Sequence, residues 1–193
     1  IKESMDDCLK LVEKLKKIIK IQAKKYQDIA MPGYTHMQKA MPTTVGIWLG
    51  SFAEALQDSI HIISASRVVI DQNPLGSGAG FGSDFEISRA ITTVKLGFAK
   101  VQENPMYCGL SRGYFETMCL QALNLSTLVL SKLVSDLLLF TTQEFCFFGL
   151  PQDYTTGSSI MPHKNNYDVL EIARGKCYIF WTYQQKIQAI YGS

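Results

Sequence analysis

Apolar residues recur every three or four positions through most of this sequence, and this spacing constrains its fold more than any other feature. Lysines and acids separate the first such positions, which are Met5, Cys8, Val12, Leu15 and Ile19. This spacing places apolar side chains along one face of a helix. We therefore expect a long amphipathic helix from residue 5 to about residue 30, where Pro32 and Gly33 stop it.

Further segments follow the same helical spacing. One starts after Pro42, with Thr43 or Thr44 as its N-cap, and continues to about Ile70. Helical periodicity resumes over residues 84–101, and a last helix is expected from near Asp168 to Ile190. Residues 113–145 are apolar nearly all round, so we expect other helices to surround this segment.

Few loops connect these helical segments. Residues 71–83 hold four glycines and a proline, which indicates an irregular segment, and residues 149–166 form a polar loop. Strand-like alternation is nowhere convincing. We predict an all-α fold, an elongated bundle of long helices, with residues 1–193 forming one domain.

Charge and cysteine content exclude several classes of protein. The 19 basic and 17 acidic residues leave a net charge of +2, which gives no bulk attraction to nucleic acid or to a membrane. Five scattered cysteines without a C-x-x-C pair suggest neither a disulfide framework nor a zinc site, and the N-terminus has no signal-peptide pattern. Polar residues interrupt the apolar run 119–140, so we interpret it as a buried helix and place the protein in the cytoplasm.

The loop at residues 156–166 carries the clearest chemical pattern, Thr-Gly-Ser-Ser-Ile-Met-Pro-His-Lys-Asn-Asn. It is similar to the G-S-S-x-M-P-x-K-x-N signature of the fumarase/aspartase superfamily. Such a loop suits elimination, because a serine supplies an oxygen for proton removal while lysine, asparagine and backbone N–H groups hold an anion. The alternative interpretation is a serine- and asparagine-rich surface connector in which Pro162 serves as a turn residue.

A second motif narrows the family. Residues 31–42, Met-Pro-Gly-Tyr-Thr-His-Met-Gln-Lys-Ala-Met-Pro, resemble the P-G-Y-T-H-x-Q-x-A-x-P segment of argininosuccinate lyases, and Pro74 to Ala79 resemble their P-L-G-S-G-A segment. A histidine beside a threonine on a short turn between helices can bind a carboxylate and transfer a proton near neutral pH. A histidine in isolation is more often an ordinary loop residue, but the match of the residues around His36 favours the functional interpretation.

The resemblance implies roles for individual residues. The catalytic candidates are Ser158 as the base, His36 as an acid or binding partner, and Glu171 as the carboxylate that polarises His36. The substrate-binding candidates are Thr35, Gln38, Ser159, Lys164 and Asn166. Glu171 has an alternative role, because its spacing from Asp168 is that of a capping box at the start of a helix.

The resemblance also implies a reaction and an assembly. Argininosuccinate lyases release fumarate and arginine in arginine biosynthesis, without a metal or organic cofactor, and build each active site from three subunits of a homotetramer. The small-molecule substrate is then a dicarboxylate. No two histidines here have metal-binding spacing with a third ligand, so we predict no metal site.

The sequence departs from the family pattern in three ways. The resemblance implies a central helical domain without the N-terminal and C-terminal domains of complete members. Asn165 replaces a second lysine and Tyr167 replaces a proline, while Gly113 stands where an acid is expected after Arg112. Two alternatives therefore stay open: another lyase of the superfamily with a different leaving group, or a non-catalytic helical scaffold or fragment.

Overall fold

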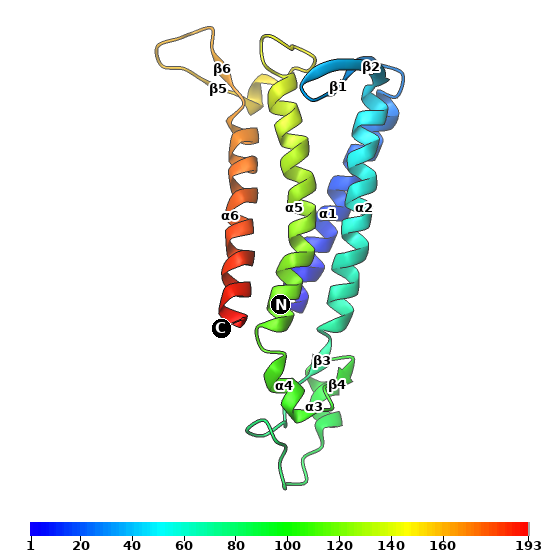
Figure 1. The fold of residues 1–193 in the computed structure, drawn as a ribbon, viewed down its shortest axis with the longest axis vertical. Helices are drawn as coiled ribbons and strands as arrows, with labels where there is room; N and C mark the ends of the chain where they lie inside the picture. Colours follow the sequence, from blue (N-terminus) through cyan, green and yellow to red (C-terminus); the bar gives the residue numbers. More distant parts are fainter. Residues whose placement is uncertain (193) are drawn as a thin grey trace.

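Four long helices run side by side along residues 1–192, the part of the chain that the computed structural model describes (Figure 1). They are α1 (Lys2–Lys25), α2 (Val45–Val69), α5 (Tyr114–Phe140) and α6 (Asp168–Tyr191). α2 packs against α1 and α5, and α5 packs against α6. This arrangement confirms the predicted all-α bundle.

Short elements lie at the two ends of the bundle (Figure 1). The end that we name the hairpin end carries β1 (Ala30–Thr35), β2 (Gln38–Thr44), η1 (Gln152–Tyr154), β5 (Thr156–Gly157) and β6 (Asn165–Asn166). The opposite end, the glycine-loop end, carries β3 (Gln72–Asn73), α3 (Arg89–Lys95), β4 (Lys100–Val101) and α4 (Pro105–Leu110). The two sequence motifs that carry the chemistry therefore lie at the same end of the molecule.

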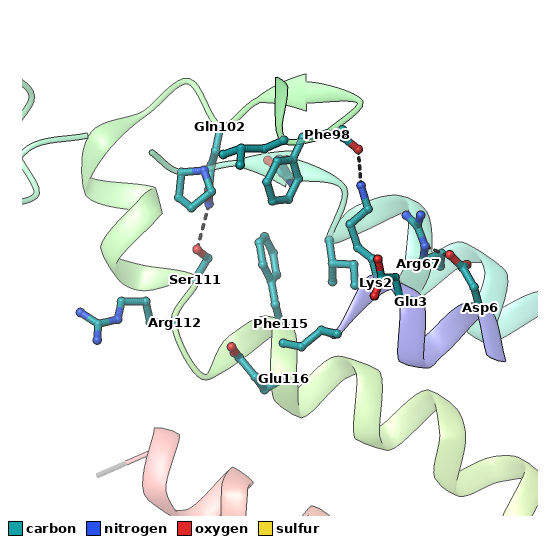
Figure 2. Close-up of a pocket in the computed structure, with 16 residues that line it drawn as sticks. Lys2, Glu3, Asp6, Arg67, Phe98, Gln102, Ser111, Arg112, Phe115 and Glu116 are labelled. Atoms are coloured by element: carbon teal, nitrogen blue, oxygen red, sulfur yellow. Dashed lines mark hydrogen bonds and ion pairs between the residues drawn. The ribbon is translucent and has the colours of Figure 1, made fainter. Parts of the chain in front are cut away.

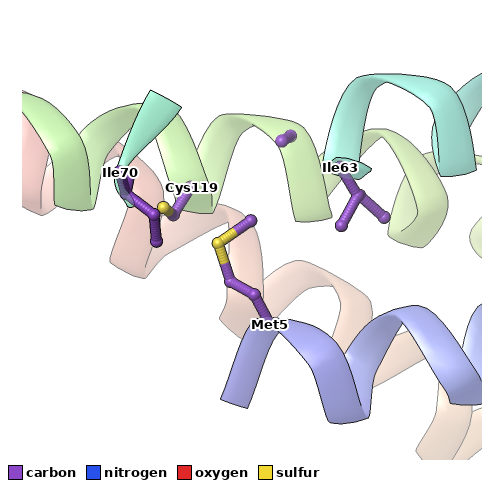
Figure 3. Packing of buried hydrophobic residues seen from close by; sticks show 5 residues of the cluster. Met5, Ile63, Ile70 and Cys119 are labelled. Atoms are coloured by element: carbon purple, nitrogen blue, oxygen red, sulfur yellow. The ribbon is translucent and has the colours of Figure 1, made fainter. Parts of the chain in front are cut away.

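The core consists of three clusters of buried side chains along the bundle. Near the glycine-loop end, Met5 of α1 packs with residues of α2 and α5 (Figure 3), and the other members are Ile63, Ile70, Cys119 and Ala122. The central cluster comprises Ile19, Ala53, Leu56 and Leu133. The third, at the hairpin end, comprises Met31, Val45 and Phe140. Burying each large side chain contributes about 1.5–3 kcal/mol to the stability of the fold, so these three clusters hold the helices together.

The helix boundaries follow local signals closely where such signals exist. Thr44 caps α2 as predicted, because its hydroxyl accepts a hydrogen bond from the Ile47 amide at 3.2 Å. α1 stops at Lys25, five residues before the predicted end, because Ala30 already belongs to strand β1. α5 likewise ends at Phe140, and the chain then folds back over the end of that helix.

Two sequence predictions were wrong. Residues 30–44 form an antiparallel hairpin and not a simple turn between helices, and two more strand pairs, β3–β4 and β5–β6, are present. The expected helix over residues 84–101 is reduced to α3, with seven residues. Periodicity failed here because most side chains of this segment are exposed and have no helix partner to pack on.

The apolar helix α5 is only partly covered in a single chain. By length and composition it could cross a membrane, yet it lies between α2 and α6, and the indole of Trp48 donates a 2.9 Å hydrogen bond to its Asp136. Only 22% of its most apolar window is buried. The prediction that other helices surround α5 is therefore met in part, because most of its side chains are only half-buried in this chain.

Candidate active site

The loop that carries the serine motif is closed at its base by two short strands. Thr156 pairs with Asn166 and Gly157 with Asn165. The hydroxyl of Thr156 lies 2.6 Å from both carboxylate oxygens of Asp168, the first residue of α6. This hydrogen bond ties the base of the loop to the helix, while residues 159–164 are exposed to solvent.

Ser158 differs from its neighbour Ser159 in its contacts. Its hydroxyl oxygen accepts hydrogen bonds from the backbone amides of Met161, at 3.2 Å, and Ile160, at 3.4 Å. Ser158 is half-buried, whereas Ser159 is exposed. Two N–H dipoles directed at one oxygen favour its anionic form, which is the form that a serine base requires.

The two polar residues that follow lie on the same loop. Lys164 is exposed, and its backbone amide donates to the carbonyl of Met161 at 3.0 Å, which makes a turn around Pro162. Asn166 is half-buried in β6. The ammonium group of Lys164 takes no part in an ion pair within residues 1–192, so it is free to bind an anion.

The histidine motif forms the tip of the β1–β2 hairpin. Thr35 pairs with Gln38, and His36 and Met37 between them form a two-residue turn with φ angles of 52° and 62°. This left-handed backbone is uncommon for residues other than glycine and costs about 1 kcal/mol each. Thr35, His36 and Gln38 are all exposed, so the turn presents three polar side chains to solvent.

One chain does not bring the predicted catalytic residues together. The hairpin lies beside α2 and the serine loop above α6, with α5 between them (Figure 1). Among the described residues, no hydrogen bond or ion pair links Ser158, His36 and Glu171. Glu171 is exposed on the first turn of α6 and its side chain does not accept from the Asp168 amide, so the capping-box interpretation was wrong.

A cavity of about 700 Å³ lies at the other end of the bundle (Figure 2). It is bordered by Lys2, Arg67 and Phe98 on one side and by Gln102 and Ser111 on the other. The Gln102 amide donates to the Ser111 hydroxyl at 2.9 Å, while the Oε1 atom of the same Gln102 side chain is buried without a partner. None of the predicted site residues lines this cavity, so it does not contribute to the candidate active site.

Two features of the site escaped the sequence analysis. The hydrogen bond from the Thr156 hydroxyl to the Asp168 carboxylate depends on the register of β5 and β6, for which the sequence carries no signal. The ring of Tyr34, adjacent to Thr35, packs against Phe140, Phe145 and Phe147. Tyr34 belongs to the motif at residues 31–42, but the sequence around it did not indicate that its ring packs against these phenylalanines.

The bundle is shared with solved lyase structures. A structure of EDDS lyase in complex with formate superposes with a TM-score of 0.89 at 24% identity, covering 93% of this chain and 36% of the other. A class II fumarase from Schistosoma mansoni gives a TM-score of 0.80 at 23% identity, covering 92% and 42%. These likenesses establish the fold of a superfamily of helical lyases.

A family model described as "Lyase" matches residues 1–179, and the chain belongs to that family. Its sequence relatives are more specific. An argininosuccinate lyase from Parabacteroides distasonis is 42% identical over 176 residues, covering 91% of this chain and 40% of its own length. One from Bacteroides thetaiotaomicron is 43% identical over 179 residues, covering 93% and 40%. The resemblance to argininosuccinate lyases is confirmed, and the chain spans about 40% of the length of these relatives.

Proposed function

We propose that this chain is the central helical part of an enzyme that cleaves argininosuccinate to fumarate and arginine. One observation carries the proposal: the hydroxyl oxygen of Ser158 receives two backbone amides on a loop that matches the signature of the superfamily. Relatives named argininosuccinate lyase, about 42% identical to this chain, support the choice of leaving group.

In the proposed reaction Ser158 removes a proton from the carbon next to a substrate carboxylate. The amides of Ile160 and Met161 stabilise the alkoxide that removes it, more strongly once loop closure excludes water. The electrons of the broken C–H bond pass transiently into the adjacent carboxylate and then form the C=C bond of fumarate as the C–N bond breaks. The carboxylate is the electron sink, so this step draws on no cofactor.

The other candidates bind the substrate or assist the leaving group. Lys164, Asn166 and Thr35 bind the carboxylates, and Ser159 and Gln38 complete the polar lining. His36, polarised by Glu171, protonates the departing guanidinium nitrogen. The exposed positions of His36 and Lys164 suit groups that meet their substrate at a surface between chains.

We propose that the active site is shared between copies in a homotetramer. Among the described residues, no hydrogen bond or ion pair joins the hairpin to the serine loop of one chain, and the half-buried apolar side chains of α5 offer a surface on which helices from other copies can pack. Each chain then supplies its hairpin to one site and its loop to another.

Fumarate formation, followed by ultraviolet absorbance, tests the proposal. The 193-residue chain mixed with argininosuccinate should release fumarate, and Ser158→Ala should lower kcat about 100- to 10,000-fold, the usual contribution of a positioned general base. Ser51→Ala is the matched control, because Ser51 is an exposed serine of α2 whose hydroxyl bonds only to the Trp48 carbonyl. This control should retain full activity.

A different outcome would favour the second candidate function, a helical scaffold without activity. Tyr167, the N-cap of α6, makes no side-chain capping hydrogen bond, so the loop lacks one restraint at that point. An assembled chain that releases no fumarate would favour the scaffold or an incomplete site, whereas a Ser158→Ala variant as active as the unmodified chain would contradict the lyase proposal.

A further inference from the structure

The β1–β2 hairpin needs support from outside itself. An isolated two-stranded hairpin is marginally stable in water, and here the turn residues His36 and Met37 also hold left-handed backbone. Strand β2 is exposed along five of its seven residues and offers little packing. The support must therefore come from β1.

The register of the β1–β2 ladder shifts next to Tyr34. Two residues of β2, Ala40 and Met41, lie opposite the single residue Gly33 of β1, so the extra residue of this bulge belongs to β2. A bulge twists the strands locally, and beside this one Met31 and Tyr34 both pack into the cluster around Phe140, although residues three apart face opposite sides of a regular strand. A Cβ atom at Gly33 would lie 2.7 Å from the Met41 carbonyl oxygen, so the position opposite the bulge requires glycine.

The ring of Tyr34 is inserted among three phenylalanines. Its centroid lies 5.6 Å from that of Phe145, 6.4 Å from Phe147 and 6.5 Å from Phe140, the last residue of α5. Such edge-on and tilted arrangements are the favourable geometries of aromatic pairs. Tyr34 is the inward-facing residue nearest to the turn, because Thr35 and His36 are exposed.

Two of these phenylalanines, Phe145 and Phe147, belong to the segment between α5 and the serine loop. After α5 the chain folds back, with the amides of Phe147 and Phe148 donating to the Phe140 carbonyl at 2.9 and 3.3 Å. From Phe148 it continues through η1 into β5 and Ser158. Tyr34 therefore contacts the rigid end of α5 and the start of the loop segment together.

We propose that Tyr34 is the positioning residue of the histidine turn. Its ring, packed against Phe140, Phe145 and Phe147, fixes Thr35 and His36 relative to α5 and to the segment that leads to Ser158. This inference rests on the proposed function for its effect on catalysis, but its structural part stands independently of any activity.

Amide hydrogen exchange tests the structural part. In Tyr34→Leu the amides of the β1–β2 ladder should exchange about tenfold faster, since a few lost aromatic contacts amount to roughly that factor, while amides of α5 near Leu133 keep their rates. Tyr34→Phe keeps the ring and should behave as the unmodified chain. Phe52→Leu, which removes a ring that contacts Trp48 but not the hairpin, is the packing control and should leave ladder exchange unchanged.

Kinetics test the positioning role. In fumarate release, Tyr34→Leu should lower kcat about tenfold with a smaller change in KM, because a displaced His36 still binds but transfers its proton poorly. Tyr34→Phe should restore kcat. If Tyr34→Leu unfolds, Gly33→Ala serves as the second variant, since it disturbs the bulge and leaves the aromatic rings intact.

The possible outcomes separate this inference from the proposed function. Faster ladder exchange in a chain that makes no fumarate would contradict the proposed function and retain Tyr34 as the anchor of the turn. Unchanged exchange and unchanged kcat in both Tyr34→Leu and Gly33→Ala would overturn the positioning role.

Discussion

Asp71, at the end of α2, joins α1 and α2 to the loop after α3. It forms ion pairs with Lys2 and Arg67 and accepts a 3.1 Å hydrogen bond from the Ala99 amide, and Arg67 also pairs with Asp6. Burial by itself raises the pKa of the Asp71 carboxyl. The hydrogen bonds from Lys2, Arg67 and Ala99 outweigh that effect and lower the pKa from 3.8 to about 2.

This pKa predicts how folding stability depends on pH. A carboxyl with a lowered folded-state pKa stabilises the fold above its unfolded value, and the contribution is lost as the pH falls from about 4 to about 2. We expect the free energy of unfolding to fall by about 1 kcal/mol over this pH range. This is less than the pKa shift alone implies, because solvent reaches the ion pairs of Asp71 with Lys2 and Arg67 and weakens them. Urea unfolding of the unmodified chain and of Asp71→Asn at several pH values measures it.

The variant should be less stable than the unmodified chain at pH 6 and should lose less stability on acidification. Asp7→Asn is the control, since Asp7 pairs only with Lys10 and both side chains are more than 70% exposed. Equal pH dependence in the unmodified chain and Asp71→Asn would contradict the assignment.

At the scale of elements, the contact between α1 and α2 depends on a glycine near the start of α2. A Cβ atom at Gly46 would lie 2.5 Å from the Cα of Gln27 and 2.9 Å from the carbonyl oxygen of Ala23. Both are backbone atoms, which cannot move aside without displacing α1 or the turn after it. Gly50, one turn further along α2, has no atom within 4 Å of the corresponding position.

The two glycines predict opposite effects of the same substitution. Gly46→Ala should lower the free energy of unfolding by about 2 kcal/mol, because the added methyl group forces the two segments apart. Gly50→Ala should raise it by about 0.5 to 1 kcal/mol, because alanine favours helix and meets open space. Urea denaturation at one protein concentration measures both, and a destabilised Gly50→Ala would show that this face of α2 is covered.

At the scale of the whole molecule, the separation of hairpin and serine loop predicts complementation. Ser158→Ala and His36→Asn should each be inactive as pure proteins. When the two variants are unfolded, mixed and refolded, the activity should exceed the sum of their separate activities. Some sites of the mixed assemblies then combine an intact serine loop from one chain with an intact hairpin from another. Fumarate release by the refolded mixture measures this.

The control is the same mixture kept folded, so that a gain in activity seen only after refolding is assigned to mixed assemblies. A refolded mixture no more active than its components would indicate that each chain completes its own site.

The sequence alone determined the long helices, a threonine cap at residue 43 or 44 and the family motifs. Helical hydrogen bonds join residues four apart and helical faces repeat every three or four residues, so these features are encoded locally. For the same reason the serine loop was recognised from contiguous residues, and Ser158 lies where that loop turns.

Only the tertiary structure decided the hairpin, the bulge opposite Gly33 and the shortening of α3. The hydrogen bonds of a strand come from another strand and not from its own neighbours in sequence. Pro32 and Pro42 also argued against strands over residues 30–44, because proline has no backbone N–H to donate to a ladder. The relation of Ser158 to His36 was likewise undetermined, because it depends on how α5 separates two loops more than a hundred residues apart. Local patterns specify which residues carry the chemistry, and packing between distant segments specifies where those residues lie.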